Sequence, residues 1–265
     1  MQPTEILALL LLSYLIGSIP FGLLLTRFFG YRDIRKEGSG NIGATNVLRT
    51  TNKPLAALTL FFDAAKGAAA IILSVYYLTY KQQNFQDLIM SEPFEHLIFG
   101  FAAILGHCFP IWLKFKGGKG VATTFGVLLV TMPVSGIFAC LTWLLMVMTT
   151  RISSLSALIA MALAPILAFL QPSLFFSFLF NGGITEIKPS DGTTHSNTWI
   201  DDIFFSLTDP ETLWVSFLYA ASILPFTTLI FWKHKDNIRR LLKGTEPKIG
   251  KKKMLQTKTD PAPLS

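Results

Sequence analysis

The stretch ILALLLLSYLIGSIPFGLLL, residues 6–25, decides the class of this protein because its twenty residues include no charged side chain. A helix of this length reaches about 30 Å, which is the thickness of the hydrocarbon core of a bilayer. No basic segment precedes the run, and no small-residue cleavage site follows it. We therefore interpret it as a retained membrane span rather than a signal peptide.

The composition of the whole chain agrees with this interpretation. Of its 265 residues, 51% are hydrophobic and only 15% are charged, and 23 are phenylalanine. This is too apolar for a soluble domain of the same size and is typical of a polytopic membrane protein. We predict an all-α integral membrane protein with seven transmembrane helices, at about 5–26, 55–79, 95–113, 121–132, 134–150, 153–171 and 212–232.

The least certain boundary lies at Pro133. Residues 121–150 form either one long tilted helix or a short segment followed by a full span. A segment of about 12 residues would be only about 18 Å long, less than the thickness of the hydrocarbon core. It would therefore need local thinning of the bilayer or support from neighbouring helices.

The distribution of basic residues favours a count of seven. With seven spans, twenty of the 23 lysines and arginines fall on one side, ten of them in the carboxyl-terminal tail. With six spans, the basic tail would move to the opposite side. Because basic segments remain in the cytoplasm, we predict that the amino terminus is external and the carboxyl terminus is cytoplasmic.

Two further segments carry no recognisable motif. Residues 172–211 are long, acidic and rich in turn-forming residues, which predicts an external loop of unknown role. Residues 1–250 are expected to form a single membrane domain. Residues 251–265 are expected to form a mobile basic tail near an anionic lipid surface.

Three polar segments from distant parts of the chain are predicted to share the cytoplasmic face. We call them loop one (GSGNIGATNVLR, residues 38–49), loop two (GHCFPIWLKFKGGKGVAT, residues 106–123) and the tail motif (KHKDNIRRLLKGTEP, residues 233–247). Glycine lets consecutive backbone N–H groups point at one anion, and hydroxyl, guanidinium and ammonium groups add hydrogen bonds and charge. A helix that starts after Asn41 or Thr45 would also direct free N–H groups at an anion. Together the segments predict a site for a phosphate-bearing ligand.

Structural interpretations remain open for each segment. GSGN alone is also typical of a turn with a helix N-cap, and FKGGKG of a basic anchor with a flexible hinge. FKGGKG is not a Walker A loop, because Leu113 and Gly120 occupy the positions that need Gly and Ser or Thr. His107 is also compatible with a structural role, as a polar side chain whose hydrogen bonds are satisfied at a helix end. Asp63 and Lys66 are expected to pair with each other or with a neighbouring helix, since unpaired charges in lipid are costly.

The three segments strongly resemble the signature motifs of the PlsY family, the bacterial acyl-phosphate:glycerol-3-phosphate acyltransferases. The resemblance follows essentially the whole chain and includes DAAKG at 63–67 and RISSL at 151–155, while the 172–211 segment is longer than the family pattern. It implies a seven-helix enzyme of the bacterial inner membrane with its active site facing the cytoplasm. Such an enzyme transfers an acyl group from acyl phosphate to the 1-hydroxyl of glycerol 3-phosphate, giving lysophosphatidic acid and phosphate for phospholipid synthesis.

The resemblance also implies a set of site residues. Those expected to bind the phosphate of glycerol 3-phosphate are Ser39, Arg49 and Lys119. Those expected to hold the reacting phosphates are Thr45, Ser154, His234 and Asn237. The remaining members of the predicted substrate-binding set are Gly40, Asn41, Asn46, Lys116, Gly117, Gly118, Gly120 and Glu246. The catalytic candidates are Lys119, Ser39 and His107.

Acyl phosphate is already activated, so the protein need not supply a covalent nucleophile; it must bring two dianions together and orient the hydroxyl. The proton acceptor is left open between His107, His234 and a substrate phosphate.

We expect no metal, cofactor or nucleic acid. The expected partners are the two substrates, membrane lipids and the enzymes that make acyl phosphate or perform the next acylation. The alternatives are a transporter for a small phosphorylated solute and a CDP-alcohol transferase, whose paired-Asp metal motif is absent from this sequence.

Overall fold

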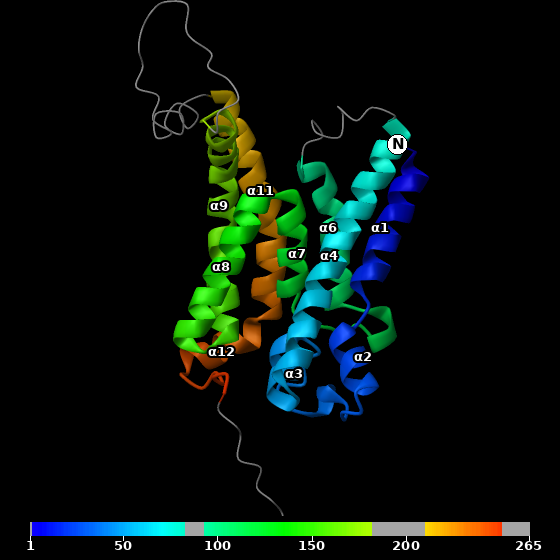
Figure 1. The fold of residues 1–265 in the computed structure, drawn as a ribbon, viewed down its shortest axis with the longest axis vertical. Helices are drawn as coiled ribbons and strands as arrows, with labels where there is room; N and C mark the ends of the chain where they lie inside the picture. The colour runs from blue at the N-terminus through cyan, green and yellow to red at the C-terminus, as the bar shows by residue number, and fades with distance from the viewer. Residues whose placement is uncertain (1, 83–92, 182–209, 251–265) are drawn as a thin grey trace, which may run out of the picture.

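The computed structural model of the chain describes residues 2–82, 93–181 and 210–250, and every regular element within these ranges is helical (Figure 1). The elements follow one another as α1 (Pro3–Gly17), α2 (Phe21–Phe28), η1 (Ile34–Lys36), α3 (Ala44–Thr50), α4 (Lys53–Gln82), α6 (Pro93–Cys108), η2 (Ile111–Leu113), α7 (Val121–Thr131), α8 (Pro133–Thr150), α9 (Ser153–Asn181), α11 (Pro210–Lys233) and α12 (Lys235–Leu242).

The predicted class of all-helical membrane protein is confirmed. Five segments of the described chain are long and apolar enough to cross a bilayer, and they lie in α4, in α6 with η2, and in α8, α9 and α11. Helices α1 and α2 are long and apolar enough to cross a bilayer only when taken together as a bent pair, with an angle of 40° between them. Helix α7 is apolar but shorter than a span. The described residues thus give five or six candidate spans, and the count of seven stays a prediction that depends on α7.

The first predicted span, 5–26, is wrong as a continuous helix, because helix α1 ends at Gly17 and helix α2 begins at Phe21. Proline at position 20 lacks the N–H that would continue the α-helical ladder. The carbonyl groups freed by the break are satisfied from other helices. The indole of Trp112 donates to the Ser18 carbonyl at 2.7 Å, and the ammonium of Lys66 donates to the Ile19 carbonyl at 2.8 Å.

The boundary at Pro133 separates two helices, α7 and α8, as the second of the two sequence interpretations required. Helix α7 is supported by close packing on α4. A Cβ atom added at Gly126 would lie 1.9 Å from the Ala64 carbonyl oxygen, and one added at Gly67 would lie 2.2 Å from the Thr123 carbonyl oxygen. Small residues let two helix backbones approach this closely, so a neighbouring helix supplies the support that a short helix needs.

The predicted external loop 172–211 begins too early, because α9 continues to Asn181 and residues 172–181 are helical. Gln171, Pro172 and Ser173 interrupt the apolar run after Leu170, but α9 continues through them into LFFSFLF, residues 174–180. Residues 182–209 and the predicted tail 251–265 lie outside the described residues.

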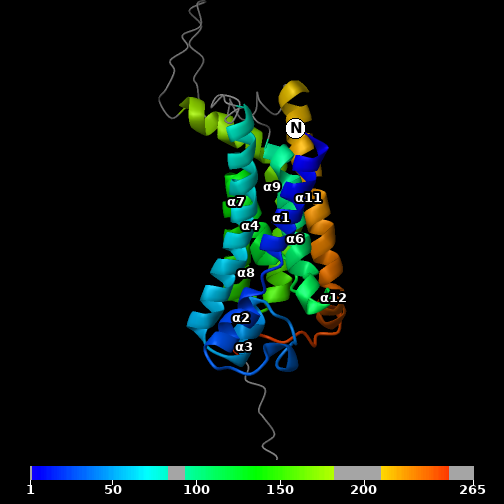
Figure 2. The same ribbon diagram turned by 90° about the vertical axis from the view of Figure 1, so that its right-hand side faces the viewer.

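Helices α2, α3 and α12 gather at the end of the bundle opposite the amino terminus (Figures 1 and 2). A small apolar cluster holds loop one there, with buried side chains from α2, η1 and α3 packed on the start of α4. A larger core runs between α6, α7, α9 and α11. The fold thereby brings loop one, loop two and the tail motif to the same end, as the sequence predicted.

Candidate active site

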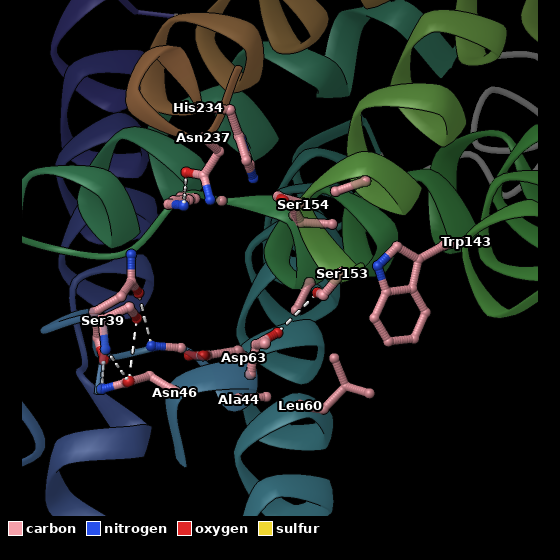
Figure 3. A pocket seen from close by; sticks show the side chains of 18 of the residues that line it. Ser39, Ala44, Asn46, Leu60, Asp63, Trp143, Ser153, Ser154, His234 and Asn237 are labelled. Carbon is pink, nitrogen blue, oxygen red and sulfur yellow. Dashed lines mark hydrogen bonds between the residues drawn. The ribbon is translucent and has the colours of Figure 1, made fainter. Parts of the chain in front are cut away.

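A cavity of about 120 Å³ opens where the three segments meet, and Figure 3 shows its side chains. Twelve of the sixteen residues predicted for the site line it: Ser39, Asn41, Thr45, Asn46, Arg49, His107, Lys119, Gly120, Ser154, His234, Asn237 and Glu246. The four that do not line it are Gly40, Lys116, Gly117 and Gly118. Lys116 and Gly40 lie on the exposed surface, whereas Gly118 is buried behind the cavity wall.

Loop one is shaped by the buried side chain of Asn46. Its amide oxygen accepts hydrogen bonds from the N–H of Ser39 at 2.7 Å and from the Ser39 hydroxyl at 3.1 Å. Its amide nitrogen donates to the carbonyls of Ile34, Glu37 and Asn41 at 2.8, 3.2 and 2.8 Å. These contacts occupy the hydrogen-bonding groups of the amide, so Asn46 holds the loop in which Ser39 is presented.

A second network joins loop two to the tail motif. The ammonium of Lys119 donates to the amide oxygen of Asn237. The amide nitrogen of Asn237 donates to Glu246 at 2.6 Å, and the same carboxylate oxygen accepts from the Ser154 hydroxyl at 2.6 Å. The other oxygen of Glu246 accepts from Arg240 Nε at 2.7 Å. Side chains from three parts of the chain are therefore held in one connected arrangement.

The remaining contacts of this end hold the segment after α12 across the site. The guanidinium of Arg49 donates to the Pro247 carbonyl at 3.2 Å, and the N–H of Ile249 donates to the Arg151 carbonyl at 2.7 Å. The Nε atom of Arg49 is buried without a hydrogen-bond partner. One donor of a cation that lines the cavity is therefore free to receive an anion.

Burial determines the protonation behaviour of the polar wall. It lowers the pKa of Lys119 to about 8, with the nearby Glu246 carboxylate opposing the shift. Burial also lowers the pKa of Arg49 below its ordinary value. Burial raises the pKa of Glu246, but hydrogen bonds from Ser154, Asn237 and Arg240 outweigh it, so the pKa lies below its ordinary value. At neutral pH the wall thus holds a carboxylate and two cations.

His234 is a neutral group in this setting. Burial and the positive charge of Lys119 lower its pKa to about 4. Its Nδ1 lies 2.8 Å from the Ile230 carbonyl, which can only accept, so Nδ1 carries the proton and Nε2 is a hydrogen-bond acceptor. Figure 3 shows the ring pointing into the cavity.

The amino-terminal ends of three helices also face the cavity. The lining includes residues 43–45 at the start of α3, residues 120–122 at the start of α7, and Ser153 and Ser154, which begin α9. No side chain caps the first turn of α3 or α7. The free N–H groups and the positive ends of the helix dipoles favour an anion. Of these three helix ends, the sequence pattern predicted only that of α3, which begins at Ala44.

An apolar wall completes the cavity opposite loop one. Trp143 and Leu60 lie on the side away from Ser39 and Asn46 (Figure 3). The other apolar residues of this wall are Val121, Ala122, Phe125 and Ala157. No local motif in the sequence predicts this wall, because its residues are ordinary apolar positions on four helices.

Asp63 and Lys66 form the predicted pair, with 2.7 Å between the ammonium and the carboxylate Oδ1. Asp63 also lines the cavity, which the sequence analysis did not anticipate. Its Oδ1 lies 3.6 Å from His107 Nδ1.

Among the described residues, no group of three or more His, Cys, Asp or Glu side chains could hold a metal ion.

Comparisons with known proteins agree with one another. Residues 7–244 match the family model described as glycerol-3-phosphate acyltransferase. A protein of that name from Rhizobium meliloti (strain 1021) is 43% identical over 247 residues, covering 93% of each chain. One from Caulobacter vibrioides (strain NA1000 / CB15N) is 44% identical over 253 residues, covering 95% of this chain and 90% of the relative.

Two solved structures are also similar. Both are of PlsY (YgiH), an integral membrane glycerol 3-phosphate acyltransferase. The glycerol 3-phosphate form has a TM-score of 0.61 and 30% sequence identity, covering 92% of this chain and 95% of that chain. The lysophosphatidic acid form has a TM-score of 0.59 and 29% identity, covering 91% and 94%.

Proposed function

The chain belongs to the glycerol-3-phosphate acyltransferase family and is an integral membrane acyltransferase, and from this premise we propose that it transfers an acyl group from acyl phosphate to the 1-hydroxyl of glycerol 3-phosphate. The products are lysophosphatidic acid and inorganic phosphate. The observation that carries the proposal is the division of one cavity into a cationic wall and an apolar wall. Such a cavity fits a phosphate and a hydrocarbon chain at the same time.

The cationic wall binds the phosphates. Arg49 and Lys119 supply two positive charges, and the starts of α3, α7 and α9 supply N–H groups. The hydroxyl of Ser39 can rotate from Asn46 toward a phosphate oxygen. Glu246 would repel a phosphate, so it acts on the substrate through the Ser154 and Asn237 side chains that it holds. Lys119, which lines the same cavity, offsets charge where the two dianions meet.

The apolar wall receives the acyl chain. Trp143 belongs to α8, of which only 17% is buried within the protein. One residue of the wall thus comes from a helix whose other faces are available to lipid. An acyl phosphate in the bilayer can reach it without passing through water.

The reaction needs no covalent intermediate. The glycerol hydroxyl oxygen attacks the acyl carbonyl carbon, the bond from that carbon to the phosphate oxygen breaks, and the hydroxyl proton goes to the departing phosphate. A phosphate monoester has a second pKa of about 6, so a phosphate dianion is a stronger base than His234, whose pKa is about 4. His234 instead offers Nε2 as an acceptor that orients the hydroxyl.

We also propose seven spans with α7 crossing as a supported short helix, and the cavity facing the cytoplasm of the inner membrane. The twenty basic residues on that side support this orientation. A transporter is not favoured, because the carbonyls at the break in the first span accept hydrogen bonds from Trp112 and Lys66 and are therefore not available to a solute.

The test uses purified protein in lipid nanodiscs supplied with acyl phosphate and radiolabelled glycerol 3-phosphate. We expect equal amounts of phosphate and labelled lysophosphatidic acid. Acyl-CoA replaces acyl phosphate in a parallel reaction, and Lys119→Ala serves as the inactive control. Product from acyl-CoA at a comparable rate, or no product from acyl phosphate, would refute the assigned donor.

A further inference from the structure

Two glycines of loop two lie outside the cavity that they were predicted to build. Gly117 and Gly118 are absent from its lining, although Lys119 and Gly120 belong to it. Neither glycine has the positive φ that favours glycine over other residues, unlike Gly120 with φ of 85°. Neither contact with the cavity nor backbone conformation therefore explains a glycine at 118.

The imidazole of His107 explains it. A Cβ atom added at Gly118 would lie 1.9 Å from Nε2 of His107, and the next nearest atoms belong to the same ring at 2.7 and 2.8 Å. The N–H of Gly118 also donates to the His107 carbonyl at 3.0 Å. Loop two therefore rests directly on this ring at the position before Lys119.

A buried ion pair lies on the other side of the ring. His107 is 4% exposed, and its Nδ1 faces Asp63 Oδ1 at 3.6 Å. Asp63 in turn pairs with Lys66 at 2.7 Å, and Lys66 donates to the Ile19 carbonyl at 2.8 Å. The ring thus lies between a buried ion pair and the loop, so a side chain added at 118 would meet the ring directly.

We propose that His107 is a positioning residue: its ring, held against Asp63, forms the floor on which Gly118 lies and thereby sets the position of Lys119 in the cavity. The proposal rests on the proposed function only in assigning a phosphate contact to Lys119. An ordinary Cβ contact is at least 3.4 Å, so alanine at 118 requires a displacement of about 1.5 Å. A displacement of about 1 Å at a reacting group costs on the order of 100-fold in rate.

The test is compensation between two substitutions. Gly118→Ala alone is expected to raise the KM for glycerol 3-phosphate about tenfold or more and to lower kcat, since Lys119 moves with the loop. His107→Ala removes the ring that the new methyl group meets. In that background, adding Gly118→Ala should change KM less than about twofold, because an alanine at 118 then has room.

Gly117→Ala is the matched control. A Cβ at Gly117 would lie 2.1 Å from the His107 carbonyl oxygen and 2.4 Å from Pro110 Cδ, and neither atom is removed by His107→Ala. Its penalty should be the same in both backgrounds. Equal penalties for Gly118→Ala in both backgrounds would overturn the proposal, as would rescue of Gly117→Ala by His107→Ala.

A second measurement does not depend on activity. The melting temperatures of the same variants should show coupling between His107→Ala and Gly118→Ala and none between His107→Ala and Gly117→Ala. If Gly118→Ala cannot be purified, recovery of folded protein in the double variant supports the proposal, and failure of both overturns it. Coupled melting temperatures in a protein inactive with acyl phosphate would refute the proposed donor and leave the role of His107 in packing intact.

Discussion

Raising the pH from about 7 to about 9 should weaken the binding of glycerol 3-phosphate, because Lys119 loses its proton within this range. Burial lowers the pKa of Lys119 to about 8, and the positive charges of Arg240 and Arg49 add to the shift against the opposing Glu246. With that pKa, the protonated fraction falls from about 90% at pH 7 to about 10% at pH 9. The dianion binds the protonated form, so affinity is present below the pKa and is lost above it.

The size of the effect follows from that fraction. The phosphate of glycerol 3-phosphate has a second pKa of about 6 and stays a dianion over this range. His234, with a pKa of about 4, and Glu246 complete their titrations at lower pH. The affinity should therefore fall about tenfold, close to 1.4 kcal/mol, through Lys119 alone.

The assay is the KM for glycerol 3-phosphate at saturating acyl phosphate, measured across this pH range. Lys119→Arg is the matched control, since a guanidinium stays protonated and its KM should be flat with pH whatever its absolute value. A flat KM in the unmodified enzyme would show that the charge of Lys119 does not bind the phosphate. The same inflection in Lys119→Arg would assign the titration to another group.

Four further outcomes are expected. Arg49→Lys should raise the KM for glycerol 3-phosphate about tenfold or more, because the two-pronged contact is lost, and an unchanged KM would assign Arg49 to topology alone. Asp63→Ala and Lys66→Ala should each reduce the yield of stable protein, and a double-mutant cycle should show coupling; normal stability with lost turnover would contradict this. A cysteine at Ser190 should react with an impermeant thiol reagent in intact cells and one at Ser39 should not, and external labelling of both would refute the topology. Enzyme quenched with acyl phosphate alone should yield no acylated peptide by mass spectrometry, whereas an adduct competent for transfer would establish double displacement.

The sequence predicted the elements that depend on local pattern. Apolar runs predicted the membrane helices. The distribution of charges predicted that loop one, loop two and the tail motif share one end, and the structure places them there. The break in the first span was missed, although Pro20 marks it, because the surrounding residues are all apolar. A membrane helix tolerates proline when other groups satisfy the freed carbonyls, and Trp112 and Lys66 are far from it in sequence.

Properties of the site that depend on distant partners could not be predicted. The starts of α7 and α9 face the same cavity as α3 only because of how the helices pack. Gly118 was interpreted as part of a phosphate cradle, since nothing in FKGGKG indicates that a histidine eleven positions earlier lies beneath it. A glycine-rich loop looks the same whether its backbone approaches a ligand or a neighbouring ring.

The carboxylates in the lining show why residue counts do not give the electrostatics of this site. Arg49 and Lys119 are cations and Asp63 and Glu246 are anions, so the lining taken alone sums to zero, a poor site for two dianions. Each carboxylate, however, has its own cation outside the lining, Lys66 for Asp63 and Arg240 for Glu246. With these pairs neutralised, two positive charges and the helix ends remain for the substrates. Replacing either carboxylate would add positive charge beside the cavity, but it would also leave a cation without its partner and release the side chains that the carboxylate holds, so we expect lower stability and poorer positioning rather than a better site.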